Sequence, residues 1–419
     1  MRVQLISQVV ILTALGLAGC GQPPEASFAV NHDKVDPLLR GARAEVARTL
    51  EENFGTPVRL VGWEKFPIDY GKADPKADSK SVRSKDGWRL VEGRNLYMTH
   101  CMHCHGVAGD GNGPTAHFLN PRPRDYRQGT FKFKSTQRAV KPSRNDLRRI
   151  LEQGIPGTYM PSFVLLGEEK LGLIIDYVRW LSIRGNLELR LAVELVGLGA
   201  TDTDVAQAVA DDETKKLTRP GAEEAAMKSV KDELPGLIDD ISTSLAESWA
   251  AAEQPESIIV PKVKRGAPDQ AAIHESIERG RKLFTSQVQG KKTECAECHG
   301  LTGRGDGPNT EKYWPIPNST PERKYEVAGL HDDWGQPQQP RNLTRGIYRG
   351  GRRPIDIFRR VHEGIPGTQM AGFANVLSHD EIWDVVNYVL SVPFEGKHTA
   401  YPGELNAEKE DKKVASNED

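Results

Sequence analysis

Apolar residues recur at helical spacing in two similar sets of segments, one in each half of the chain. The first segment of each set carries an apolar stripe that includes a glycine and ends in an aromatic residue: Leu90, Gly93 and Tyr97 in one copy, and Ile273, Ile277, Gly280 and Phe284 in the other. The last segment of each set has one amphipathic face: Leu171, Ile174, Ile175, Val178 and Leu181 in one copy, and Ile382, Val385, Val386 and Val389 in the other. The pattern predicts that each half packs a first helix closely against a last one, with the glycine permitting the approach.

Shorter helices are expected between these segments, over residues 144–153 and 354–363. Gly154 and Gly364 follow them, in the position that favours a helix stop. Ser378 and Glu381 have the spacing of a capping box, which predicts where the last helix of the second copy begins. A further helix is expected near residues 33–53, so the chain is predicted to be mainly α.

The segment between the two copies has a different character. Residues 194–256 contain fifteen acidic side chains against five basic ones, yet their apolar residues recur at helical spacing: Leu234, Leu237, Ile238, Ile241, Leu245 and Trp249. We therefore expect an acidic, partly helical connector. The tail after Pro402 is charged and lacks aromatic residues, which is typical of disorder.

The overall composition excludes wholesale disorder and gives no reason to expect a nucleic-acid partner. Hydrophobic residues make up 37% of the 419 positions, and 56 basic residues balance 58 acidic ones. The positive charges are nevertheless clustered, because ten basic residues lie within 121–149 and seven arginines lie within 341–360. A basic rim of this kind steers acidic partners by long-range attraction.

The N-terminus has the features of an export signal. Met1 and Arg2 precede a predominantly apolar stretch, residues 3–17, that is too short to span a bilayer comfortably. The sequence Leu17-Ala18-Gly19-Cys20 then resembles the lipobox of bacterial lipoproteins. The resemblance implies that residues 1–19 are removed and that acyl chains on Cys20 anchor the protein to a membrane on its extracytoplasmic side. Ordinary signal cleavage beside an unmodified cysteine is the alternative.

The other four cysteines form two C-x-x-C-H motifs, the attachment signature of c-type haem. The motifs are residues 101–105 and 295–299, and a Gly/Pro-rich turn follows each of them at 109–114 and 303–308. The sequence Gly-Ile-Pro-Gly-Thr-x-Met then occurs at 154–160 and again at 364–370. The chain is therefore a tandem repeat, and its second copy is longer between the histidine and the methionine.

Two thiols at this spacing can reach both vinyl groups of one porphyrin, and the adjacent histidine can then reach the iron. The alternatives are a zinc site built from the four cysteines and a pair of thioredoxin-like redox centres. The histidine after each pair and the export signal favour haem.

The order of these features resembles the class I cytochrome c fold, twice over. Each copy has a helix with Gly-x-x-x-aromatic, a C-x-x-C-H motif, a Gly/Pro loop, a methionine loop and a last helix that carries Tyr177 or Tyr388. The resemblance implies two tandem cytochrome c domains. The expected division is a signal segment (1–19), a tether with an N-terminal helical segment (20–84), domain 1 (85–190), the acidic connector (191–267), domain 2 (268–395) and a disordered tail (396–419). Residues 312–339, an aromatic and proline-rich insertion, depart from the family pattern, and shielding of the haem edge is the one role expected of them.

The resemblance also assigns haem contacts, two covalently bound haem c groups in all. It implies thioether bonds from Cys101 and Cys104 to one haem and from Cys295 and Cys298 to the other. It further implies that His105 and His299 are the proximal iron ligands and that Met160 and Met370 are the distal ones. His117 is the alternative to Met160.

Two further sets of residues are expected to support the haems. The backbone carbonyls of Pro114 and Pro308 are expected to accept the hydrogen bond of the proximal imidazole. Arg122, Arg124 and Arg341, which lie beside prolines in the basic segments, are expected to neutralise haem propionates.

An iron with imidazole on one side and thioether on the other has no position left for oxygen or peroxide, so electron transfer is favoured over catalysis. The resemblance implies a lipid-anchored, extracytoplasmic dihaem cytochrome that passes single electrons between a membrane respiratory complex or terminal oxidase and its redox partner. The alternatives are a dihaem cytochrome c peroxidase, which needs one open distal position, and the haem subunit of a periplasmic dehydrogenase.

Overall fold

The computed structural model describes residues 26–214, 216–265, 269–317, 319 and 321–395, and this part of the chain is mainly α-helical. The expected signal segment 1–19, Cys20 and the expected tail 396–419 lie outside the described residues. The α-helices of the described part are α2 (His32–Val35), α3 (Arg40–Phe54), α4 (Trp88–His100), α5 (Met102–His105), α6 (Arg144–Gln153), α7 (Gly167–Gly197), α8 (Asp202–Asp211), α9 (Arg219–Ala251), α10 (Gln270–Phe284), α11 (Cys295–His299), α12 (Pro354–Glu363) and α13 (His379–Ser391). The rest consists of loops, short 3₁₀ turns and isolated β-bridges.

Each repeat is built on one closely packed helix pair, as the apolar stripes predict. In the first repeat α4 packs against α7, and a Cβ atom at Gly93 would lie 2.3 Å from the backbone oxygen of Leu173. In the second repeat α10 packs against α13, and a Cβ atom at Gly280 would lie 2.1 Å from the backbone oxygen of Asp384. An aromatic pair also joins the two helices in each repeat. The ring centroids of Tyr97 and Tyr177 are 5.2 Å apart, and those of Phe284 and Tyr388 are separated by the same distance.

The shorter elements also match their expected positions. Helices α6 and α12 end where Gly154 and Gly364 adopt φ values of 65° and 75°. The capping box of Ser378 and Glu381 is present at the start of α13. The helix expected over 33–53 is divided into α2 and α3, because Pro37 lies between them and a helix rarely continues through a proline.

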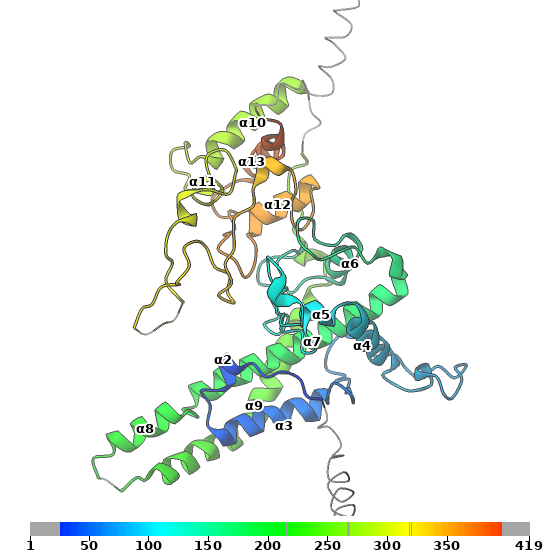
Figure 1. The fold of residues 1–419 in the computed structure, drawn as a ribbon, viewed down its shortest axis with the longest axis vertical. Coiled ribbons are helices and arrows are strands. Elements are labelled where there is room, and N and C mark those ends of the chain that lie inside the picture. The colour runs from blue at the N-terminus through cyan, green and yellow to red at the C-terminus, as the bar shows by residue number, and fades with distance from the viewer. Residues whose placement is uncertain (1–25, 215, 266–268, 318, 320, 396–419) are drawn as a thin grey trace, which may run out of the picture.

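The connector is not a separate unit. Helix α7 continues to Gly197, so the boundary expected at residue 190 lies inside a helix. Helix α9 folds back along α7, with α3 beside them and α8 at the far end (Figure 1). The buried side chains of Leu234, Ile241, Leu245 and Trp249 on α9 belong to the same hydrophobic core as α3, α4 and α7. The N-terminal segment, the first repeat and the connector therefore form one packed body.

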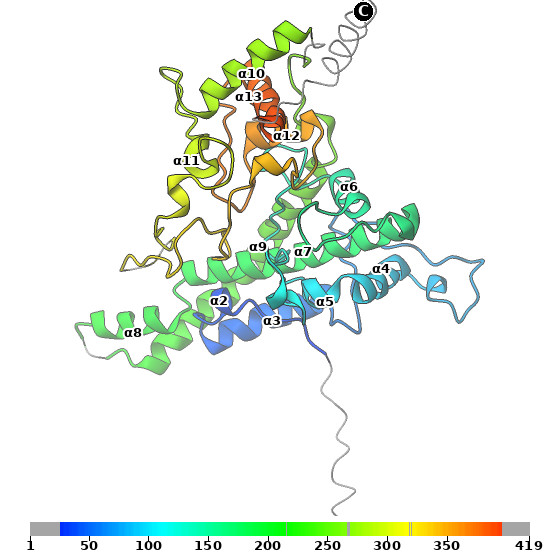
Figure 2. The ribbon, with the colours of Figure 1, turned by 45° about the horizontal axis from the view of Figure 1, so that its top comes forward.

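The second repeat has its own hydrophobic core, in which Phe358, Ile382, Val386 and Tyr388 are fully buried. It lies against the side of the first repeat that carries α6 (Figure 2). Polar contacts join the two repeats: Arg149 pairs with Asp356, and the backbone nitrogen of Arg138 donates to Glu363 over 2.7 Å. Within the described residues, no helix combines the length and the apolar character needed to cross a bilayer.

Candidate functional site

The two C-x-x-C-H motifs form matching one-turn helices. In the first repeat, α5 follows α4 after a break at Cys101, and Tyr97 Oη donates to the carbonyl of Gly106 over 2.8 Å. In the second repeat the equivalent turn is α11. Glycine ends both turns with φ near 76°, a conformation that other residues rarely adopt. Each motif thus presents its cysteines and its histidine from one tight turn.

Both motif histidines are half-buried, and a backbone carbonyl holds each of them. Nδ1 of His105 lies 3.3 Å from the carbonyl oxygen of Arg124, and Nδ1 of His299 lies 3.1 Å from that of Arg341. A carbonyl only accepts, so Nδ1 carries the proton and Nε2 keeps its lone pair. Burial lowers the pKa of His105 to about 4 and also lowers that of His299. Both rings are therefore neutral at physiological pH, which is the state that binds iron.

The expectation that Pro114 and Pro308 supply these carbonyls is wrong. The residues around Pro114 turn toward the outside of α5, where Gly113 N donates to Cys104 O over 3.1 Å and Thr115 N donates to His103 O over 2.9 Å. Gly307, which precedes Pro308, makes the same bond to Cys298 O over 3.2 Å. These backbone bonds hold the residues next to both prolines against the motif helix. The carbonyl that accepts from each imidazole belongs instead to a segment later in the chain.

That later segment could have been found from the sequence. Pro123-Arg124-Asp125 in the first repeat matches Pro340-Arg341-Asn342 in the second. The glycine-rich turns let these segments come close, since a Cβ atom at Gly111 would lie 2.7 Å from Pro123 O and one at Gly305 would lie 2.5 Å from Pro340 O. The repeated Pro-Arg pair is visible in the sequence. Only the fold, which brings this segment close to the glycine-rich turn, identifies the arginine carbonyl as the acceptor of the histidine proton.

The methionine loops of the two repeats make equivalent hydrogen bonds. Thr158 Oγ1 donates to Ile155 O over 2.8 Å and accepts from the backbone nitrogen of Met160 over 3.1 Å. In the second repeat Thr368 makes the same pair of bonds, to Ile365 O over 2.8 Å and from Met370 N over 3.2 Å. The Gly-Ile-Pro-Gly-Thr sequence thus builds a rigid turn that fixes the position of each methionine.

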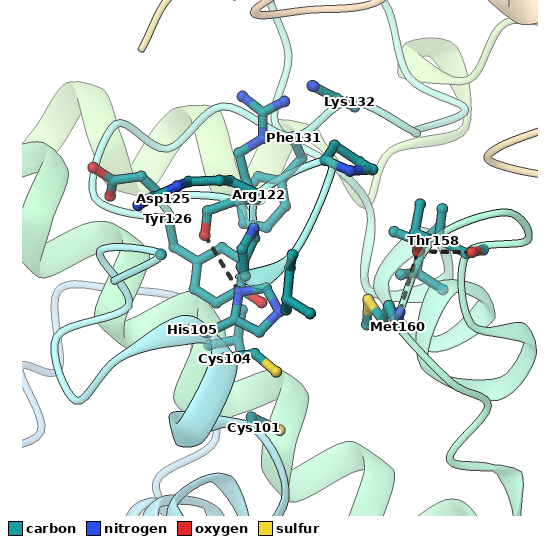
Figure 3. Close-up of a pocket in the computed structure, with 18 of the residues that line it drawn as sticks. Cys101, Cys104, His105, Arg122, Asp125, Tyr126, Phe131, Lys132, Thr158 and Met160 are labelled. Carbon is teal, nitrogen blue, oxygen red and sulfur yellow. Dashed lines mark hydrogen bonds between the residues drawn. The ribbon is translucent and has the colours of Figure 1, made fainter. Parts of the chain in front are cut away.

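The first repeat contains a cavity of about 640 Å³, a size suited to a small-molecule cofactor. Cys101, Cys104 and His105 line one side of it, and Met160 lies across from them (Figure 3). His117 is not among the lining residues; its ring packs against Phe118 at 3.7 Å between centroids. Met160 is therefore better placed than His117 to face His105 from the opposite side of a bound haem.

The cysteines fit thioether attachment better than either alternative. Burial raises the thiol pKa of Cys101 and of Cys295 to about 12, whereas a reactive redox thiol needs a lowered pKa. Within the described residues, no group of three or more His, Cys, Asp or Glu side chains could hold a metal ion, so the zinc alternative has no site there. A porphyrin attached through both cysteines would instead meet an apolar wall that includes Phe131, Ile174 and Val178.

The three arginines proposed as propionate partners occupy different surroundings. Arg122 and Arg124 line the cavity of the first repeat, and Arg122 Nη1 donates to Asn112 Oδ1 over 3.3 Å. Arg341 belongs to the second repeat, but its guanidinium lies against Gly157 in the methionine loop of the first, where a Cβ atom would be 2.4 Å from Nη2. Residues of the second repeat also line the cavity: Asp332, Trp334, Gln336 and Arg349. None of these four was among the expected site residues, although three of them belong to the insertion 312–339.

Comparison with known proteins gives a family for both repeats. The cytochrome c family model matches the chain twice, over residues 90–182 and 277–393, which together span about half of it. No match was found among curated proteins. Among solved structures, a chain of the Kuenenia stuttgartiensis reducing HAO-like protein complex is similar to this one, with 25% sequence identity and a TM-score of 0.45; the match covers 72% of this chain and 95% of that chain.

Proposed function

Because the chain belongs to the cytochrome c family, whose domains bind haem c covalently and transfer electrons, we propose that it is a dihaem electron carrier with one haem in each repeat. The haem supplies one-electron redox chemistry when it is bound. The chain's own residues attach it through Cys101 and Cys104 or through Cys295 and Cys298, orient it and exclude water from its iron.

The observation that carries this proposal is that both repeats make the same hydrogen bonds to the motif histidine and within the methionine loop. Each repeat offers a neutral, half-buried imidazole whose Nδ1 donates to a backbone carbonyl, and a methionine whose loop is held by the hydrogen bonds of a threonine. Two protein ligands on one iron leave no open position for a substrate. Both irons would change valence with little rearrangement, which favours electron relay and disfavours the peroxidase alternative.

We further propose that the carrier is a lipoprotein on the extracytoplasmic side of a membrane. The lipobox-like sequence that ends in Cys20 supports this location. In this setting the protein would pass single electrons between a membrane respiratory complex and a redox partner. The basic segments 121–149 and 341–360 favour an acidic docking surface on that partner.

The test of the carrier function uses the purified holoprotein. Its intact mass should exceed that of the mature chain by two covalently bound haems, and the reduced spectrum should be that of low-spin c-type haem with methionine ligation. Potentiometric titration should then resolve two one-electron steps. Turnover of hydrogen peroxide by the reduced protein, or a high-spin five-coordinate haem, would contradict the proposal and favour an enzyme.

A further inference from the structure

Three nitrogen donors at the cavity of the first repeat lack a hydrogen-bond partner in the part of the chain that the structure describes. Arg124 Nη1, Trp334 Nε1 and Arg349 Nε are buried from solvent, and none of them has a hydrogen-bond acceptor among the described residues. All three residues line the same cavity as His105 and Met160. Burying a donor without an acceptor is unfavourable, and it is more unfavourable for a charged group. Three such donors in one cavity indicate a bound group that carries several acceptor oxygens.

Trp334 comes from the second repeat and is held firmly in place. It belongs to a turn in which Asp332 Oδ1 accepts from the backbone nitrogens of Trp334 and Gln336, over 3.1 and 3.0 Å. Its ring packs on the methionine loop of its own repeat, since a Cβ atom at Gly367 would lie 2.5 Å from it. From the first repeat, the Arg124 guanidinium carbon lies 3.7 Å from the ring centroid, within cation–π distance. The insertion 312–339 thus brings an indole N–H to the first cavity.

Arg349 reaches the same cavity from a second loop of the second repeat. The neighbouring Gly350 packs against Phe133 of the first repeat, where a Cβ atom would lie 2.4 Å from the ring. Burial and the nearby Arg341 both lower the pKa of Arg349. Arg349 and Arg341 repel each other, and Arg349 is half-buried. An anion beside them would stabilise both positive charges.

The acidic groups nearby do not meet this need. Asp332 attracts Arg124 more than any other carboxylate does. Its oxygens, however, accept from the backbone of its own turn and from Gln338 Nε2 at 3.2 Å, and they pair with Lys132 Nζ at 3.6 Å. It contributes long-range attraction to Arg124 without accepting from Nη1. The three free donors therefore require an anion that arrives with the ligand.

We propose that Trp334 and Arg349 of the second repeat, together with Arg124 of the first, bind the propionate groups of the haem held by Cys101, Cys104 and His105. The second repeat thereby completes the haem site of the first. This inference rests on the proposed dihaem function. It also gives the insertion 312–339 a defined role, which is to close the first site through Trp334. The two redox centres are then coupled through shared side chains, because the loop that holds Trp334 is also packed on the methionine loop of the second site.

The test measures the two midpoint potentials of the holoprotein in single variants, with the potential of the first haem identified as the one that moves in Met160→His. Arg349→Gln removes a positive charge beside the propionates and should disfavour the reduced state of the first haem about tenfold, a fall of about 59 mV for one electron. Trp334→Phe keeps an aromatic side chain but loses the indole N–H, so it should change the reduction equilibrium of the same haem by about threefold. Arg349→Lys keeps the positive charge, so its first midpoint potential should stay close to that of the unaltered protein.

The matched control is Arg138→Gln. This variant also removes a positive charge at the contact between repeats, where Arg138 Nη1 donates to Glu363 O over 3.0 Å. Arg138 does not line the cavity of the first repeat. It should leave both potentials unchanged. The proposal is overturned if both haems are attached and neither Arg349→Gln nor Trp334→Phe moves the first potential, or if Arg138→Gln moves it equally. If Arg349→Gln fails to fold, Trp334→Phe decides. Absence of haem from the unaltered protein would instead defeat the proposed function itself.

Discussion

A single hydrogen bond decides which nitrogen of each motif imidazole stays free for iron. The carbonyls of Arg124 and Arg341 can only accept, so Nδ1 of His105 and of His299 carries the proton. In each repeat a threonine hydroxyl that donates to an isoleucine carbonyl also fixes the loop that carries the methionine. Because these hydrogen bonds match between the repeats, we expect any difference between the two redox potentials to arise from other residues, such as the arginines around the first cavity.

Substitution of the methionines tests the ligand assignment. Met160→His exchanges a thioether, which stabilises ferrous iron, for an imidazole, so one of the two midpoint potentials should fall by more than about 59 mV, a tenfold change in the reduction equilibrium. Met370→His should lower the other potential. Spectroelectrochemical titration measures both.

Met98→Leu is the control, because Met98 packs against the core of the first repeat and does not line the cavity. It should leave both potentials nearly unchanged. An unchanged titration in Met160→His would exclude Met160 as a ligand.

Helix packing in both repeats depends on a glycine at the crossing point. The backbone of α4 meets that of α7 at Gly93, and the backbone of α10 meets that of α13 at Gly280. The apolar stripes predict these pairs well because helical periodicity is a local property of the sequence. The length of α7 is predicted less well. Its last turns are covered by α9 from the connector, and such a tertiary contact leaves no local signal at residue 190.

Gly280→Ala should destabilise the second repeat. The new Cβ would lie 2.1 Å from the backbone oxygen of Asp384, so α10 and α13 would have to separate, at a cost of about 1–3 kcal/mol in the free energy of unfolding. Denaturant unfolding of the holoprotein measures the change.

Gly236→Ala provides the opposite case on α9. A Cβ atom there would meet nothing within 4 Å, so this variant should be stabilised by about 0.5–1 kcal/mol through the better helix propensity of alanine. Equal stability of the Gly280→Ala protein and the unaltered protein would show that the helices do not cross as closely as described.

The molecule is organised around two hydrophobic cores and a polar contact between them. One core joins the N-terminal segment, the first repeat and the connector, and the other belongs to the second repeat. Charged and aromatic groups meet between the repeats: Arg124 stacks on Trp334, Lys132 lies 3.6 Å from Asp332, and Arg149 pairs with Asp356. The contact therefore places the second repeat beside the haem cavity of the first and lets it contribute side chains there.

The location of the whole protein is tested at Cys20. Cys20→Ser removes the thiol that a lipid anchor requires, so the protein should move from the membrane fraction to the soluble fraction. Fractionation and immunoblotting measure this, with the haem spectrum as a check that both repeats still fold. Membrane association that persists in the variant would rule out Cys20 as the anchor.

The local sequence by itself determined the cofactor chemistry and the helical framework. A few neighbouring residues encode the paired cysteines next to His105 and His299, the methionines in their matching loops, and the stripes that form the helices. The tertiary structure decided the rest. The carbonyl that accepts from each histidine belongs to Arg124 or Arg341 rather than to a proline, and Trp334 and Arg349 reach a cavity built by the other repeat. The reason is physical: these partners are brought together by chain reversal and by packing between repeats, and such distances are set by the whole fold rather than by residue spacing.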